Sequence, residues 1–218
     1  MPTEHEAQDK AAVQRPNLLA GEQLPPPARQ ERSRQKRDAL LQAALELFAQ
    51  HGYEATSIED IAQRSAVAVG SFYQHFASKR QVLLVLMERM LAEAASLTRT
   101  AGNANLGTVE TAIKQLVRQG LQVDWAYAGA SRAWHEAAVL DSTLGRLHQE
   151  VEHWTAGELA IILRILLKAP GARLLPEIDT LAWVLSLLFW RLAETELPDA
   201  ETVIEAVSLL IYHALFSD

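Results

Sequence analysis

The chain has no cysteine among its 218 residues, which excludes disulfide bonds and every cysteine-based metal or redox site. It also lacks a long uninterrupted apolar run, since the longest, from Leu181 to Trp190 and broken by Ser186, is too short to span a bilayer. The first residues are polar and charged, so no secretory signal is visible. These absences predict a protein of the reducing cytoplasm with no membrane partner.

Catalytic signatures are equally scarce. The sequence contains no Gly-rich phosphate loop, no nucleophile elbow and no HExxH motif, so we assign no catalytic residue, metal or cofactor and expect no enzyme. The alternative of a metal protein or an enzyme rests on His148 and Glu152, which share one helical face at i and i+4, with His153 next to them. Two ligands do not complete a zinc site, which takes three or four.

Basic residues are not in excess over the whole chain, whose formal net charge is −7 at pH 7. Their distribution is uneven, because residues 29–90 hold nine Lys/Arg against seven Asp/Glu, whereas residues 91–218 hold nine against sixteen. The basic run that enters the first predicted helix consists of Arg29, Arg32, Arg34, Lys36 and Arg37. Such a run is either a solvated charged face or, beside a DNA-binding motif, a segment that lies along phosphates or enters a minor groove.

Residues 1–30 contain Pro2, Pro16 and the triplet Pro25-Pro26-Pro27, and they have no periodic pattern of large apolar residues. A segment of this composition buries too little apolar surface to fold, so we predict a disordered tail over residues 1–30. Docking of Leu18 and Leu19 onto the rest of the protein is the weaker alternative.

Residues 37–83 contain three short helical patterns joined by tight turns, which is the layout of a helix-turn-helix. The first helix is predicted over residues 33–51 and ends at Gly52, because Leu40, Ala44 and Leu47 recur on one face. The second begins with a capping box between Thr56 and Glu59. After a break at residues 65–67, a short helix over residues 68–75 is expected to enter the major groove of DNA.

The order and spacing of these patterns resemble the DNA-binding domain of the TetR family of transcriptional regulators. The residues that carry the resemblance are Ala43-Ala44, Leu47-Phe48, Gly52-Tyr53, Thr56-Ser57-Ile58, Ile61-Ala62, Val67, Gly70-Ser71-Phe72-Tyr73, His75-Phe76 and Ser78-Lys79. The resemblance implies a DNA-binding regulator, most naturally a repressor, that binds a palindromic operator as a homodimer. It also implies release from DNA by a small hydrophobic or aromatic effector.

The resemblance further assigns roles to individual positions. A phosphate is expected at the helix N-terminus formed by Thr56 and Ser57. The side chains implied in gripping the DNA backbone are Tyr73, His75 and Lys79, and those implied on or near the groove side are Val69, Gly70, Ser71 and Gln74. Together with Arg34 and Lys36 they form the predicted DNA contact set.

Two positions depart from the family pattern. Ala66 stands where the family usually has Gly, so the turn must relax or tolerate strain. Ala68 stands where a Ser or Thr often caps the recognition helix, and that cap is missing. Since Val69 also replaces a polar or basic base reader, we predict that specificity depends on methyl contacts, DNA shape and backbone fit, with Gln74 suited to adenine.

The remainder of the chain is helical by period and shows no convincing strand. Helices are expected near residues 107–124, 127–139, 141–168, 178–195 and 199–216, with Asp141 and Asp199 as N-caps and breaks at Pro170 and Pro198. The predicted fold is all-α. It comprises a helix-turn-helix DNA-binding domain over residues 31–77 and a helical effector-binding and dimerisation domain over residues 78–218.

The last two predicted helices carry more apolar surface than one buried face requires, so they are covered either by the chain's own core or by a second copy. The TetR resemblance favours a dimer interface built from Leu187, Trp190, Val203, Val207, Leu210 and Ile211. A two-fold dimer sets its recognition helices roughly 34–36 Å apart, so the operator is expected to be an approximate palindrome.

Aromatic residues and histidines are concentrated in the middle helices, and none of the five Trp lies in the DNA-binding segment. Large apolar side chains with one polar group suit a ligand cavity, although they also serve as core residues. The candidate ligand contacts are Trp125, Trp134, His135, Trp154 and Trp183. The alternative is a helix-turn-helix dimer with no small-molecule effector, acting as a constitutive DNA binder or a scaffold, which predicts a filled core.

Overall fold

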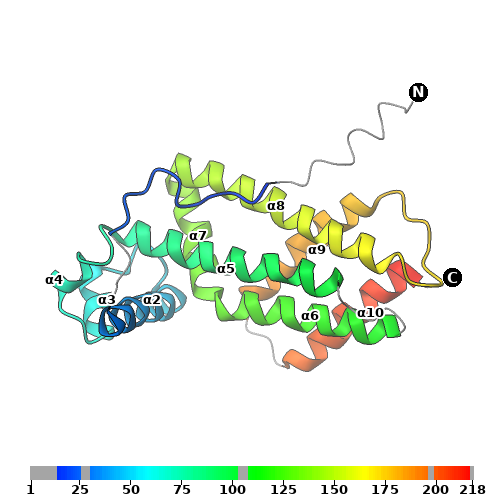
Figure 1. The fold of residues 1–218 in the computed structure, drawn as a ribbon, viewed down its shortest axis with the longest axis horizontal. Coiled ribbons are helices and arrows are strands. Elements are labelled where there is room, and N and C mark those ends of the chain that lie inside the picture. The colour runs from blue at the N-terminus through cyan, green and yellow to red at the C-terminus, as the bar shows by residue number, and fades with distance from the viewer. Residues whose placement is uncertain (1–13, 26–29, 103–107, 196–198, 217–218) are drawn as a thin grey trace.

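The computed structural model describes residues 14–25, 30–102, 108–195 and 199–216, and in these ranges it contains helices, turns and loops but no strand. The helices are α2 (Glu31–His51), α3 (Ile58–Arg64), α4 (Val69–Phe72), α5 (Lys79–Gly102), α6 (Val109–Ala126), α7 (Ala128–Leu140), α8 (Ser142–Leu166), α9 (Ile178–Ala193) and α10 (Ala200–Phe216). Figure 1 shows α2, α3 and α4 at one end of the molecule, with α5 leading from them into the larger helical body. The all-α prediction is confirmed. None of the helices in these ranges combines the length and apolarity needed to cross a bilayer.

Residues 14–25, which we call the N-terminal strap, correct the prediction of a disordered tail. Leu18 is only 1% exposed and belongs to the apolar cluster that includes α2 and α5. Arg15 forms an ion pair with Glu88 of α5, and Glu22 accepts a hydrogen bond from Gln81 at 3.0 Å. A single leucine inserted between existing helices needs no periodic pattern, so periodicity missed it. Residues 1–13 and 26–29 of the predicted tail, with Arg29, and the predicted break at Pro198 lie outside the described residues.

The start of α3 differs by one residue from the prediction. Ser57, not Thr56, is the N-cap: its hydroxyl oxygen accepts a hydrogen bond from the amide of Asp60 at 3.0 Å. The carboxylate of Asp60 accepts the amide of Ser57 in return, also at 3.0 Å. Thr56 is unavailable because its buried hydroxyl group donates to the carbonyl oxygen of Gly52 at 2.7 Å. The capping box is therefore Ser57–Asp60.

The turn between α3 and α4 has the two departures expected from the sequence. Ala66 has a φ of 53°, in the left-handed region that costs a residue with a Cβ about 1–2 kcal/mol. Ala68 is the N-cap of α4 and makes no side-chain hydrogen bond to it. The N-caps predicted at Asp141 and Asp199 are also present, since both side chains accept backbone amides at the starts of α8 and α10.

The helix-turn-helix segment and the helical body share an apolar core rather than meeting at a polar boundary. One cluster extends from α2 and the strap through α5 and α7 to Trp154 in α8. α2 crosses α7 so closely that a Cβ on Gly129 would lie 2.1 Å from the carbonyl oxygen of Leu45 and 2.9 Å from the amide nitrogen of Ala49. Only glycine permits this approach, which fixes the position of α2 on the body.

Candidate nucleic-acid interface and effector cavity

α4 points its side chains in two opposite directions. Phe72 is fully buried, whereas Tyr73 is 52% exposed and Val69 is 37% exposed. Gly70 and Gln74 are exposed beside them, and the spacing of these positions places them on one side of the helical turn. We call Val69, Gly70, Tyr73 and Gln74 the α4 outer face. It offers one amide side chain, one phenol, one small apolar side chain and a backbone open to close approach.

Ser71 and His75 were predicted at the DNA but are turned inward. The hydroxyl oxygen of Ser71 is buried and has no hydrogen-bond partner among the described residues. His75 is 7% exposed, and its burial, followed by the charges of Arg37 and Lys36, lowers the pKa of its imidazole. The structure therefore separates these two side chains from the α4 outer face, because so short a helix has one side packed on the rest of the helix-turn-helix, α3 included.

Two further predicted DNA contacts hold the loop between α2 and α3. Thr56 is 2% exposed. The ammonium group of Lys79 donates to the carbonyl oxygen of Tyr53 at 2.5 Å and lies 4.3 Å from the centre of the Tyr53 ring. Burial lowers the pKa of Lys79. In this conformation Lys79 connects the first turn of α5 to the loop, and Ser57 remains half-buried at the start of α3.

Glu136 of α7 is a connection that the sequence did not suggest. Its carboxylate accepts the backbone amides of Tyr53 at 2.6 Å and of Glu54 at 3.1 Å. A Cβ on Gly52 would lie 2.6 Å from the same carboxylate. The loop that positions α3 is thus held by α5 on one side and by α7 on the other. A glutamate on an amphipathic helix is typical of a solvated face, so no sequence signal distinguished it.

The basic residues predicted on α2 lie next to α4. Arg34 is exposed and pairs with Glu31 at 2.7 Å. An exposed pair of this kind is worth little, so a DNA phosphate can replace Glu31 at small cost. Arg37 lies over the ring of Phe76 at 4.8 Å, and both Arg37 and Lys36 are close enough to His75 to lower its pKa. The amino-terminal half of α2 therefore places positive charge beside His75 and Phe76, the residues that follow α4.

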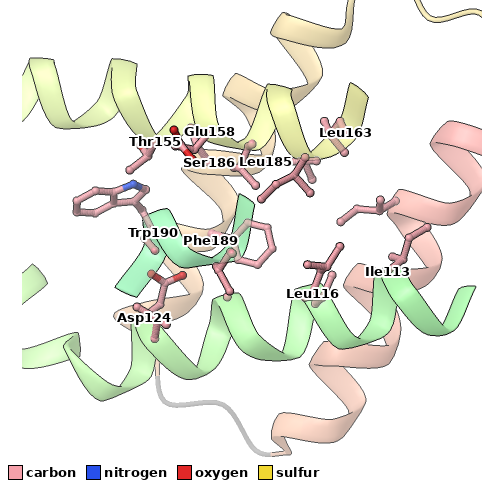
Figure 2. Close-up of a pocket in the computed structure, with 18 of the residues that line it drawn as sticks. Ile113, Leu116, Asp124, Thr155, Glu158, Leu163, Leu185, Ser186, Phe189 and Trp190 are labelled. Carbon is pink, nitrogen blue, oxygen red and sulfur yellow. The ribbon is translucent and has the colours of Figure 1, made fainter. Parts of the chain in front are cut away.

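A cavity of about 120 Å³ lies between α5, α6, α8 and α9, with Ile211 of α10 also in its lining. Its walls are mostly aliphatic, and the residues that add aromatic or polar groups are Asp124, Trp154, Thr155, Glu158, Ser186, Phe189 and Trp190. Figure 2 shows Asp124 on α6 and Glu158 on α8 approaching the space from opposite sides. Burial raises the pKa of Asp124 to about 7.

Of the five predicted ligand contacts, only Trp154 lines this cavity. Trp134 is fully buried and donates its indole N–H to Nδ1 of His148 at 3.0 Å, which makes it a core residue. His135 pairs with Glu194 at 2.8 Å. Trp125 is partly buried against an apolar cluster formed mainly by α6, α8, α9 and α10, and Trp183 is 38% exposed on α9. Aromatic content indicated the right region but not the lining, which depends on how four helices are rotated.

The outer surfaces of α9 and α10 carry five large exposed apolar side chains: Trp183, Val184, Leu187, Leu209 and Leu210. Two of them, Leu187 and Leu210, belong to the predicted dimer interface. Val207 and Ile211 are 6% and 5% exposed and pack in the chain's own core, with Val203 partly buried beside them. Trp190 lines the cavity instead. The candidate interface is therefore shifted around both helices, and it includes Trp183.

His148 and Glu152 lie 3.3 Å apart between Nε2 and Oε1, as their spacing on α8 predicted. His153 faces elsewhere, with Nδ1 2.8 Å from the carbonyl oxygen of Gln149. Over the described ranges, no group of three or more His, Cys, Asp or Glu side chains is arranged to hold a metal ion.

Comparison with known proteins gives the same assignment as the helix-turn-helix geometry. The profile of the family described as "Bacterial regulatory proteins, tetR family" matches residues 40–86, which extend from the middle of α2 to the first turns of α5. The helix-turn-helix segment of this chain is that of the TetR family. The chain is 37% identical over 116 residues to the HTH-type transcriptional regulator TcmR of Streptomyces glaucescens, covering 51% of this chain and 50% of the relative.

A second TetR-family relative is the HTH-type transcriptional repressor KstR2 of Mycolicibacterium smegmatis, with 46% identity over 48 residues, covering 22% of this chain and 23% of the relative. The chain thus spans half or less of the length of these curated relatives, which are named as regulators of transcription and not as enzymes. The solved structure of the regulator PfmR from Thermus thermophilus superposes with a TM-score of 0.61 at 23% identity. The superposition covers 80% of this chain and 94% of PfmR. At that identity the likeness shows the fold alone.

Proposed function

We propose that this protein is a cytoplasmic, DNA-binding repressor of transcription that binds a palindromic operator as a homodimer and is released by a small apolar effector. The α4 outer face carries the proposal. Tyr73 and Gln74 are exposed in the turn that directly follows α4, the second helix of a helix-turn-helix, where they reach a phosphate and a base edge when α4 enters a major groove. The basic half of α2 lies beside His75 and Phe76, which follow α4.

The outer apolar residues of α9 and α10 support the dimer. Exposed apolar side chains of this size mark a contact surface when they gather on neighbouring elements. A two-fold axis through this surface would bring α9 and α10 of both copies together and place the two α4 helices on one side of the dimer. Leu187→Glu is expected to give a monomer in sedimentation, whereas Leu174→Glu, at a residue that is 96% exposed in a loop, is expected to leave the dimer intact.

Helix α5 connects the cavity to the helix-turn-helix, and this connection supports release from DNA by an effector. Met90, Ala94 and Leu97 of α5 line the cavity, and the same helix begins at Lys79, which is bonded to the loop before α3. A ligand that displaces α5 therefore displaces the helix-turn-helix as well. The ligand shifts the balance between DNA-bound and released forms only by its difference in affinity for the two.

The test is a mobility-shift assay with the DNA that flanks the gene. Tyr73→Ala should weaken binding to all sequences alike, and Gln74→Ala should relax discrimination at one base-pair position by about 1–3 kcal/mol. Gln122→Ala, at an exposed glutamine of α6, is the matched control and should bind as the parent does. A dimer that ignores this DNA at low salt contradicts the proposal. Binding without release by any compound in a melting-temperature screen favours the effector-free alternative.

A further inference from the structure

The charge of the cavity restricts what it can bind. Two of its lining residues, Asp124 and Glu158, carry carboxyl groups, and no lysine, arginine or histidine of the described ranges lines it. An anionic ligand, such as a fatty acid or a phosphate ester, would enter an apolar space with no positive group from these ranges to meet it. A neutral ligand would leave the carboxyl groups without a charge partner. A cation is the ligand class that both groups favour.

The two carboxyl groups differ in their surroundings. Glu158 accepts a hydrogen bond from the hydroxyl group of Thr98. For Asp124 no described side chain or backbone group supplies a hydrogen bond or a neighbouring charge, and burial is the cause that raises its pKa. Asp124 is half-buried by exposed fraction and lines the cavity. A buried carboxylate without a partner is costly, so a cation placed there recovers much of that cost.

The cavity also has a polar end and an apolar end. Figure 2 shows Asp124, Thr155, Glu158 and Trp190 at one end and Ile113, Leu116 and Leu163 at the other. Trp190 lines the same end of the cavity as Asp124, and Trp154 and Phe189 add two further aromatic rings to the lining. Aromatic faces attract ammonium groups, and the attraction grows when water is excluded. The lining thus matches a molecule with a charged head and an apolar body.

We propose that the effector is a lipophilic organic cation whose ammonium group pairs with Asp124 beside Trp190 and whose apolar body extends toward Ile113. The proposal rests on the proposed function, because it names the ligand class of that effector site. The volume of about 120 Å³ holds roughly ten water-sized groups, so a one-ring amine fits without displacing a helix. A larger cation would separate α5 from α6, which is the movement that carries the helix-turn-helix.

The test compares benzyltrimethylammonium with neopentylbenzene, its uncharged isostere, by calorimetric titration of the full-length protein. The cation should bind about tenfold more tightly or better at pH 8.5. The charge of the cation does not change with pH, so any pH dependence of its binding must come from a titrating group of the protein. If only the ionised carboxyl group binds it, affinity should rise about 30-fold from pH 5.5 to pH 8.5, in proportion to the ionised fraction.

Two matched amide variants assign the effect to one residue. Asp124→Asn should abolish both the preference for the cation and the pH dependence, whereas Glu158→Gln should keep the pH dependence. Equal affinity for the two compounds, no binding of the cation at millimolar concentration, or an unchanged pH dependence in Asp124→Asn would each overturn the proposal. A mobility shift measured without any compound tests the repressor separately. If the protein binds DNA but not the cation, only the inference of a cationic effector is wrong. If it binds the cation but not DNA, the proposed function is wrong.

Discussion

Replacing Asp124 by asparagine should change how the stability of the protein depends on pH. Burial raises the pKa of this carboxyl group from 3.8 to about 7 in the folded protein, so the folded state holds its proton where the unfolded state releases it. The stability that comes from the protonated group is therefore fully present below pH 3.8 and is lost as pH rises through 7. Asparagine cannot ionise, so the stability of the variant should not fall in this pH range for this reason.

The magnitude follows from the size of the shift. A difference of about three pKa units corresponds to about 4 kcal/mol between the acidic and alkaline limits. The part that falls between pH 5 and pH 8 is about 2–3 kcal/mol. For a chain of this length each kcal/mol changes the melting temperature by about 2–4 °C. Raising the pH from 5 to 8 should therefore raise the melting temperature of Asp124→Asn relative to that of the parent by roughly 5–10 °C.

The assay is thermal unfolding of parent and variant at both pH values and equal protein concentration. Asp141→Asn is a control with the opposite environment, because backbone amides of Leu144 and Thr143 lower the pKa of Asp141. Asp141 is ionised at both pH values, so its variant should show the parent's pH dependence. All other titrating groups are common to the chains and cancel in the comparison.

One result would refute the reasoning. If the melting temperatures of Asp124→Asn and the parent change equally between pH 5 and pH 8, Asp124 is not held protonated by burial. The carboxyl group would then have a charge or hydrogen-bond partner of its own, and the argument for a cationic effector would lose its main support.

Three further substitutions test the packing. Leu18→Ala should lower the free energy of unfolding by about 2–4 kcal/mol in chemical denaturation, and a loss below that of an exposed Leu174→Ala would show that the strap is not part of the core. Ala66→Gly should raise the free energy of unfolding by up to about 1 kcal/mol by relieving the left-handed turn, and a decrease would place the strain elsewhere. Gly129→Ala should lower the melting temperature by an amount equivalent to about 3 kcal/mol and weaken DNA binding, because α2 must move away from α7. If Gly129→Ala matches the parent in both measurements, α2 and α7 are farther apart at Gly129 than the structure shows.

The sequence alone determined the features whose causes are local. Helix ends depend on caps a few residues away, as at Asp141 and Asp199, and the helix faces depend on a period of 3.6 residues. The strained turn at Ala66 was also visible, because it depends on one residue type at one position. The helix-turn-helix was recognised because its spacing lies within fewer than fifty consecutive residues.

Only the tertiary structure decided which side chains meet. Leu18 is buried because α5 and α2 leave room for it, and Ser71 faces inward because α4 is packed on the rest of the helix-turn-helix, α3 included. The cavity combines residues from α5, α6, α8 and α9, whose rotations about their own axes no local pattern specifies. An aspartate at position 124 is expected at the surface by its residue type alone. It becomes a largely buried carboxyl group because helices distant in the sequence enclose it, and that enclosure arises from packing over the whole chain.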